Sequence, residues 1–102
     1  MNPSRPWKVI YLPEPLRDFA ELYKLAKRFG RVLEVRDAAR RIHARLHAAP
    51  DEYGEEAFHY HNLRLLLRVA FQDPLAVRFC VHEVEPLVIV KTILALPGKG
   101  FD

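Results

Sequence analysis

The chain has 102 residues, half of them hydrophobic and 28% charged, so its length fits one domain and its composition a globular protein rather than a disordered one. Its one cysteine, Cys80, excludes an intrachain disulfide framework, and no uncharged apolar run approaches the roughly 20 residues of a membrane span. The N-terminus lacks the apolar core of a signal peptide. We therefore expect a cytoplasmic protein that spans no membrane.

The charge is unevenly distributed along the chain. The formal net charge is +3, but residues 1–47 hold 11 Lys and Arg against 5 Asp and Glu, whereas residues 48–102 hold 5 against 8. The positive first half has two explanations. It forms the solvated sides of helices, or it attracts an acidic partner.

The first half of the chain predicts a short strand followed by a helical hairpin. Residues 7–12 are β-branched and aromatic and stop at two prolines, which indicates an edge strand. A helix then runs from Glu14 to a glycine at position 30, with an apolar face formed by Leu16, Phe19, Ala20, Tyr23, Ala26 and Phe29. A second helix covers about residues 32–48, with a stripe of Val35, Ala38, Ala39, Ile42, Leu46 and Ala49. Residues 31–35 alone also suit a strand.

The second half predicts sheet. After a polar loop at 51–56, strands are expected at 63–71, 75–82 and 87–96, separated by turns that contain proline. The last strand is almost continuously apolar, which is typical of a central strand covered on both faces. The expected fold is therefore α+β with the order β-α-α-β-β-β. In it, a helical hairpin packs on a small, mainly antiparallel sheet in one domain over residues 1–102.

Strand alternation predicts which side chains share a face of this sheet. If the odd positions of the 63–71 and 75–82 strands face the helices, the even positions carry four basic or titratable residues to the opposite face: Arg64, Arg68, Arg78 and His82. That face is either an ordinary exposed polar surface or a site for an anionic ligand.

The order of these elements resembles the RelE/ParE superfamily of toxins from type II toxin–antitoxin systems. The resemblance covers about residues 7–96 and rests on the opening strand, the charged hairpin, the 46–56 stretch and the three later strands. It implies a small cytoplasmic toxin that a cognate antitoxin protein neutralises. RelE-like members cleave mRNA on the ribosome with basic side chains of the sheet, and ParE-like members poison DNA gyrase.

The resemblance also implies particular site residues. Arg64 and Arg68 match basic positions of the family's second strand, while Ala76 stands where the family often has an arginine. Arg78 lies one strand repeat later on the same predicted face, and Lys99 and Phe101 are the C-terminal candidates. Both an active endoribonuclease and a catalytically degenerate relative stay open.

The chemistry of RNA cleavage agrees with these residue types. Attack by a 2′-hydroxyl needs proton transfer and stabilisation of phosphate charge, and arginine matches phosphate through its rigid fork. We expect Arg64, Arg68, Arg78 and His82 as the catalytic set, with His82 as acid or base. The expected nucleic-acid-binding set is Arg64, Arg68, Arg78, Lys91 and Lys99. Lys91 either extends to the rim of the sheet or points into the basic face.

Other clusters in the sequence indicate less. The pair His43 and His47, together with the pair His59 and His61, lacks the glutamate and cysteine partners of common zinc motifs, so we expect no metal site and no cofactor. Cys80 is expected to be an inert, buried thiol.

A non-enzymatic protein-binding module of the same fold is the rival prediction. It would bind an acidic segment through the basic helices, where Arg36, Arg40 and Arg45 would matter and the sheet arginines would not. Gyrase inhibition through the helical hairpin is a third possibility.

Overall fold

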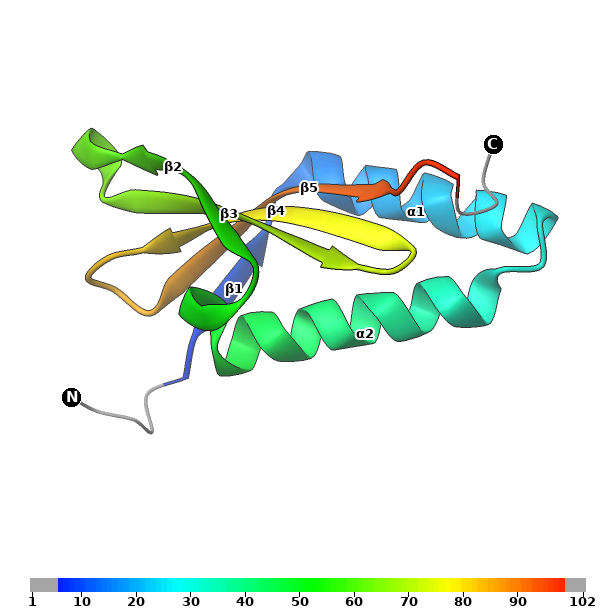
Figure 1. Cartoon of the computed structure of the whole chain (residues 1–102), viewed down its shortest axis with the longest axis horizontal. Coiled ribbons are helices and arrows are strands. Elements are labelled where there is room, and N and C mark those ends of the chain that lie inside the picture. The colour runs from blue at the N-terminus through cyan, green and yellow to red at the C-terminus, as the bar shows by residue number, and fades with distance from the viewer. Residues whose placement is uncertain (1–5, 99–102) are drawn as a thin grey trace.

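The computed structural model describes residues 6–98 and confirms an α+β fold in which two helices pack on one sheet (Figure 1). The sheet has five strands, one more than the sequence predicts. The elements in chain order are β1 (Lys8–Tyr11), α1 (Pro13–Arg28), α2 (Val32–Ala48), the 3-10 turn η1 (Pro50–Glu52), β2 (Glu55–Tyr60), the 3-10 turn η2 (His61–Leu63), β3 (Leu65–Gln72), β4 (Leu75–His82) and β5 (Leu87–Ala95).

The helical hairpin forms as predicted. Pro13 and Pro15 lie in the first turn of α1, where a missing N–H costs no hydrogen bond. Gly30, with φ +69°, follows the helix in the left-handed conformation. The region that also suited a strand, 31–35, becomes the first turn of α2, because its buried Val35 continues the stripe through Ala38, Ile42 and Leu46.

The strand order is β1-β5-β4-β3-β2, with β1 parallel to β5 and all other neighbours antiparallel. The prediction of an edge position for β1 is confirmed. The expectation that the last strand is covered on both faces is only half right. Val88, Val90 and Ile93 are buried under the helices, whereas Leu94 on the other face is 40% exposed.

The additional strand, β2, occupies the segment that the sequence predicts as a polar loop and its continuation. It pairs with β3 at the edge of the sheet, with an irregularity between Glu56 and Phe58. Most of its residues are exposed, so its glutamates stay hydrated, as is common on edge strands. A polar sequence is compatible with an edge strand, and composition alone therefore does not reveal it.

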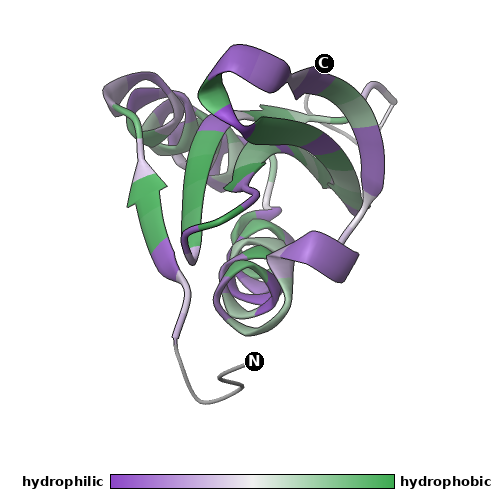
Figure 2. Cartoon of the chain, turned by 90° about the vertical axis from the view of Figure 1, so that its left-hand side faces the viewer, coloured by the Kyte–Doolittle hydropathy of each residue, from purple (hydrophilic) through white to green (hydrophobic). Residues whose placement is uncertain are grey.

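The core lies between the helices and one face of the sheet. Phe79 is its largest fully buried side chain and stacks at 5.8 Å on Tyr53, which precedes β2. α1 packs mainly on β5, and α2 contacts β1, β3 and β4. Apart from the polar edge strand β2, the strands are mainly hydrophobic, while both helices mix hydrophobic and hydrophilic residues (Figure 2). This single layer of helices leaves the opposite face of the sheet without a covering helix.

The register confirms the predicted alternation on β4 and contradicts it on β3. Val77 and Phe79 face the helices, as expected for odd positions of β4. Their partners across the ladder are Ala70 and Arg68, so even positions of β3 also face the helices. The sequence misleads here because β3 is apolar at both parities, and the larger apolar residues lie on the open face.

Candidate functional site

Arg68 is a buried structural residue and not part of an open basic face, so the predicted placement is wrong. It is 8% exposed. Its Nε–H donates to the Tyr53 carbonyl at 2.8 Å, and its Nη2 donates to the Gly54 carbonyl at 2.9 Å. The guanidinium thus ties β3 to the chain that enters β2. Its Nη1 lies 3.9 Å from the Glu56 carboxylate. Because the side chain is buried and its other two nitrogens donate to backbone carbonyls, Arg68 is not presented to a ligand.

Arg64 does not lie in the predicted cluster either. It ends η2 with φ 53° and lies one residue before β3. Its backbone N–H donates to the His61 carbonyl, and its own carbonyl accepts from Glu83 N at 2.9 Å. The residue therefore serves the turn between β2 and β3. Of the three arginines expected on one face, Arg68 is buried on the helix side and Arg64 lies in the turn before β3. Arg78 is the one exposed on β4.

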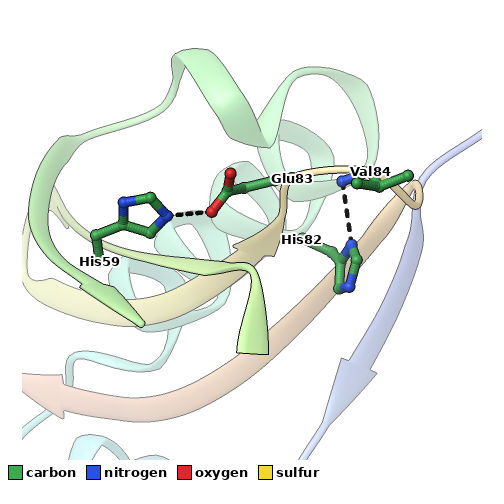
Figure 3. A network of polar contacts seen from close by, with 4 residues as sticks. All are labelled: His59, His82, Glu83 and Val84. Atoms are coloured by element: carbon green, nitrogen blue, oxygen red, sulfur yellow. Dashed lines mark hydrogen bonds and ion pairs between the residues drawn. The ribbon is translucent and has the colours of Figure 1, made fainter. Parts of the chain in front are cut away.

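His82 is held by the turn that follows β4. Its Nδ1 accepts hydrogen bonds from the backbone N–H groups of Glu85 at 3.0 Å and of Val84 at 3.1 Å, and Figure 3 shows the contact with Val84. An Nδ1 that accepts two hydrogen bonds carries no proton, which places the proton of the neutral ring on Nε2. The imidazole therefore stabilises the β4–β5 turn. Nearby, His59 contacts the Glu83 carboxylate and links β2 to the same turn (Figure 3).

Two of the predicted nucleic-acid-binding residues do come together on the open face of the sheet. Arg78 and Lys91 line one small hollow of about 140 Å³ with Tyr60, Leu67 and Thr92. The β4–β5 pairing shifts between Arg78 and Phe79, so that Lys91 falls at the irregularity beside Thr92. The sequence left Lys91 either at the rim of the sheet or on the basic face, and the structure places it beside Arg78 on the open face.

Tyr60 completes this cationic hollow, which we define by Arg78, Lys91, Tyr60 and Thr92. The Lys91 ammonium lies 5.3 Å from the centroid of the Tyr60 ring, within the range of a cation–π interaction. Sequence reasoning missed Tyr60 and Thr92, because Tyr60 belongs to the strand that was not predicted. The other member of the predicted binding set, Lys99, lies with Phe101 outside the described residues.

Cys80 lies beneath this face and is 2% exposed. Burial raises the pKa of its thiol, and the positive charge of Lys91 offsets part of that rise. A protonated, buried thiol is a poor nucleophile. The expectation of an inert cysteine agrees with this geometry.

An apolar depression lies between the two helices and opens over the core. We call it the helical groove: a cavity of about 560 Å³ with α1 on one side and α2 on the other. Its apolar lining includes Pro15, Leu16 and Phe19 from α1 and Ile42 from α2, over a floor of Leu75 and Ile93. Leu16 is 55% exposed, so the groove presents uncovered apolar surface to solvent.

The rim of the helical groove is polar and positively charged. Arg36 and Arg40 line it from α2. Arg36 Nη2 donates to the Tyr23 hydroxyl at 3.0 Å across the groove, and this hydrogen bond lowers the pKa of Tyr23. Arg45, the third basic residue of the rival prediction, instead lies over the Tyr53 ring at 5.0 Å. Two of those three arginines are therefore available to a ligand in the groove.

Tyr11 and His43 line one wall of the groove, and His47 lies beside His43. The Tyr11 hydroxyl lies 2.8 Å from His43 Nδ1. The His43 and His47 rings meet at 4.3 Å. The pKa of His43 is lowered, first by burial and then by the charge of His47. In the described part of the chain, no three potential metal ligands gather into a site.

Comparison of the chain with protein-family models, with curated proteins and with solved structures finds no match. Among residues 6–98, no helix is long and apolar enough to cross a membrane. The helical groove and the cationic hollow are the two candidate binding surfaces of the described residues.

Proposed function

We propose that this chain is a toxin-like cytoplasmic protein that binds an acidic, amphipathic segment of a partner protein in its helical groove. The observation that carries the proposal is an apolar groove whose rim holds Arg36 and Arg40. In the terms of the family resemblance, the partner is an antitoxin. In the terms of the rival prediction, it is the target of a non-enzymatic binding module.

The lining of the groove supports an amphipathic occupant. Leu16, Phe19 and Ile42 offer pockets for apolar side chains that recur at helical spacing, as in other helix-in-groove complexes. None of the described lining residues is a carboxylate, and the surplus of positive charge lies in the first half of the chain. Charge complementarity then favours acidic residues along the flanks of the segment.

A synthetic helical peptide tests the proposal directly. The probe carries leucines along one face and glutamates on its flanks, and the control peptide replaces every glutamate by lysine. We expect saturable binding of the glutamate peptide by fluorescence anisotropy. The variant R36E/R40E should weaken this binding about tenfold or more, equivalent to about 1.4 kcal/mol.

The matched control reverses two charges away from the groove. Arg17 and Arg28 are exposed on α1 and do not line the groove, so R17E/R28E changes the net charge by the same amount. Equal weakening by both double variants would mean that binding follows overall charge, and the groove assignment would be wrong. Equal binding of the lysine peptide would also refute it.

A second candidate function, RNA binding on the open face, is favoured by the cationic hollow. Arg78 and Lys91 supply charge for phosphates, and Tyr60 supplies a ring for base stacking. The arrangement supports binding better than cleavage, because the imidazole expected to move protons, His82, is held by the turn. A catalytically degenerate relative of RelE-like toxins fits this description.

Unstructured fluorescent RNA tests this second function. R78A/K91A should weaken binding and reduce the slope of log K against log salt by about 1.4, or 0.7 per lost phosphate contact. R17A/K24A removes two exposed charges elsewhere and should reduce the slope less than R78A/K91A does. Identical slopes would exclude the cationic hollow. Gels of RNA and of supercoiled DNA with gyrase, run side by side, separate cleavage and gyrase inhibition from binding.

A further inference from the structure

The Tyr11–His43 pair is a hydrogen-bonded contact between two titratable side chains in the wall of the helical groove. Tyr11 comes from the end of β1 and His43 from the fourth turn of α2, and both line the groove. The Tyr11 hydroxyl and His43 Nδ1 are 2.8 Å apart, and the two rings stack at 5.9 Å. The pair joins a strand to a helix beside uncovered apolar surface.

The direction of this hydrogen bond depends on the protonation of His43. Burial raises the pKa of Tyr11, so the phenol keeps its proton near neutral pH. When the imidazole is neutral and carries its proton on Nε2, the hydroxyl donates its only proton to Nδ1. When the imidazole is protonated, Nδ1–H donates to the phenol oxygen instead. The hydroxyl proton is then free for another acceptor.

We propose that Tyr11 and His43 form a proton-gated subsite for a carboxylate of the segment that occupies the helical groove. This inference rests on the proposed function and extends it to a particular ligand group. In the protonated state the subsite offers a positive charge and a free phenolic donor, both of which bind a carboxylate. In the neutral state with the ring proton on Nε2, it offers neither.

The surroundings of His43 support a carboxylate ligand rather than a cation. On α2, Arg36, Arg40, His43 and His47 follow each other at intervals of four, three and four residues, which places them along one side of the helix. From α1 the groove presents only apolar residues and Tyr23, and from the sheet Tyr11, Leu75 and Ile93. Hence no described lining residue competes as an internal carboxylate.

The same contacts give the direction of the pH dependence. The free protein holds the pKa of His43 below its ordinary value, through burial and the charge of His47. A bound carboxylate favours the imidazolium and raises that pKa. By linkage, affinity for the carboxylate must rise as the pH falls through this range. Each unit of upward shift corresponds to a tenfold gain in affinity.

Three peptides and the intact chain test the inference. All share the leucine face. The first carries glutamate flanks and an amidated C-terminus, the second glutamine flanks with an amidated C-terminus, and the third glutamine flanks with a free C-terminal carboxylate. Dissociation constants are measured between about pH 7.5 and pH 5.5, where glutamate stays ionised. A gain of about tenfold with the first or third peptide identifies a side-chain or a C-terminal carboxylate as the ligand.

Variants separate the role of His43 from a general effect of pH. H43Q should flatten the pH dependence to less than about threefold, and Y11F should lower affinity at low pH while it keeps part of the dependence. H47Q should move the midpoint of the pH dependence upward, because the charge of His47 helps to lower the pKa of His43. A purely structural role for His43 would leave that midpoint unchanged in H47Q.

The outcomes distinguish the two proposals. Binding whose pH dependence survives in H43Q overturns the subsite and leaves the groove function standing. Absence of binding at every pH overturns the groove function, and the subsite is then decided by NMR. The His43 ring signal, assigned with H43Q, should titrate at a higher pH in sodium acetate than in sodium chloride. Equal titration in both salts overturns the subsite.

Discussion

Arg68→Ala tests whether the arginine of β3 supports the fold or contacts a ligand. The guanidinium donates to the Tyr53 carbonyl at 2.8 Å and to the Gly54 carbonyl at 2.9 Å, and the side chain is 8% exposed. A hydrogen bond from a charged donor contributes about 1.5–3 kcal/mol. Gly54 is exposed, so water replaces part of the second bond. We expect a loss of about 3 kcal/mol in the free energy of unfolding.

Thermal and urea unfolding measure this loss. For a domain of this length, 3 kcal/mol corresponds to a fall in Tm of about 12 °C or more. The matched control is Arg78→Ala on the neighbouring strand, where the side chain is exposed and the expected change is below about 0.5 kcal/mol. Arg68→Lys should be intermediate, since one ammonium does not match two carbonyls as a fork does. If R68A unfolds within about 2 °C of R78A, the structural role assigned to Arg68 is refuted.

Three further predictions follow from backbone geometry and titration. Gly54→Ala should lower the free energy of unfolding by about 2 kcal/mol or more, because its Cβ would lie 2.3 Å from the Val69 carbonyl oxygen. Gly30→Ala, which has a similar φ but open space around it, should lower it by about 1 kcal/mol. Equal losses in urea titrations would contradict this prediction. Arg64 has a left-handed φ of 53°, and glycine relieves this strain of about 1–2 kcal/mol but loses more backbone entropy on folding. Arg64→Gly should therefore raise Tm slightly. A Tm below that of Arg64→Ala would count against this prediction. Since the fold lowers the pKa of His43 from 6.5, the unfolded chain binds more protons, and the free energy of unfolding should fall as the pH drops from 6.5 toward the lowered value. His43→Gln should remove that part of the slope in urea unfolding, and an unchanged slope would disprove it.

The helices and one strand follow from local sequence. The apolar positions of α1 and α2 recur at helical spacing, so each helix could be predicted from its own residues and ended at Gly30 and Pro50. On β4, small or polar residues alternate with large apolar ones, and the predicted face is correct. Each of these elements buries one face, and the residues that form that face all lie within the element itself.

The candidate sites required tertiary structure. The helical groove is a space between two helices, and no periodicity along α1 or α2 gives the separation that opens it. Arg36 and Arg40 were predicted to bind an acidic segment, but Arg45 was grouped with them because nothing local shows that it packs on Tyr53. Likewise, Arg78 and Lys91 share a hollow only because the β4–β5 pairing is irregular between them.

By itself, the sequence determined the fold class, the helical hairpin, the edge position of β1 and the faces of β4. Tertiary structure alone decided the register of β3 and the existence of β2. The physical reason is that the larger apolar residues of β3 lie at its odd positions, so burial energy within the strand favours the face that the structure leaves open. The decision falls to partners far along the chain, above all the two carbonyls before β2 that bind the Arg68 guanidinium.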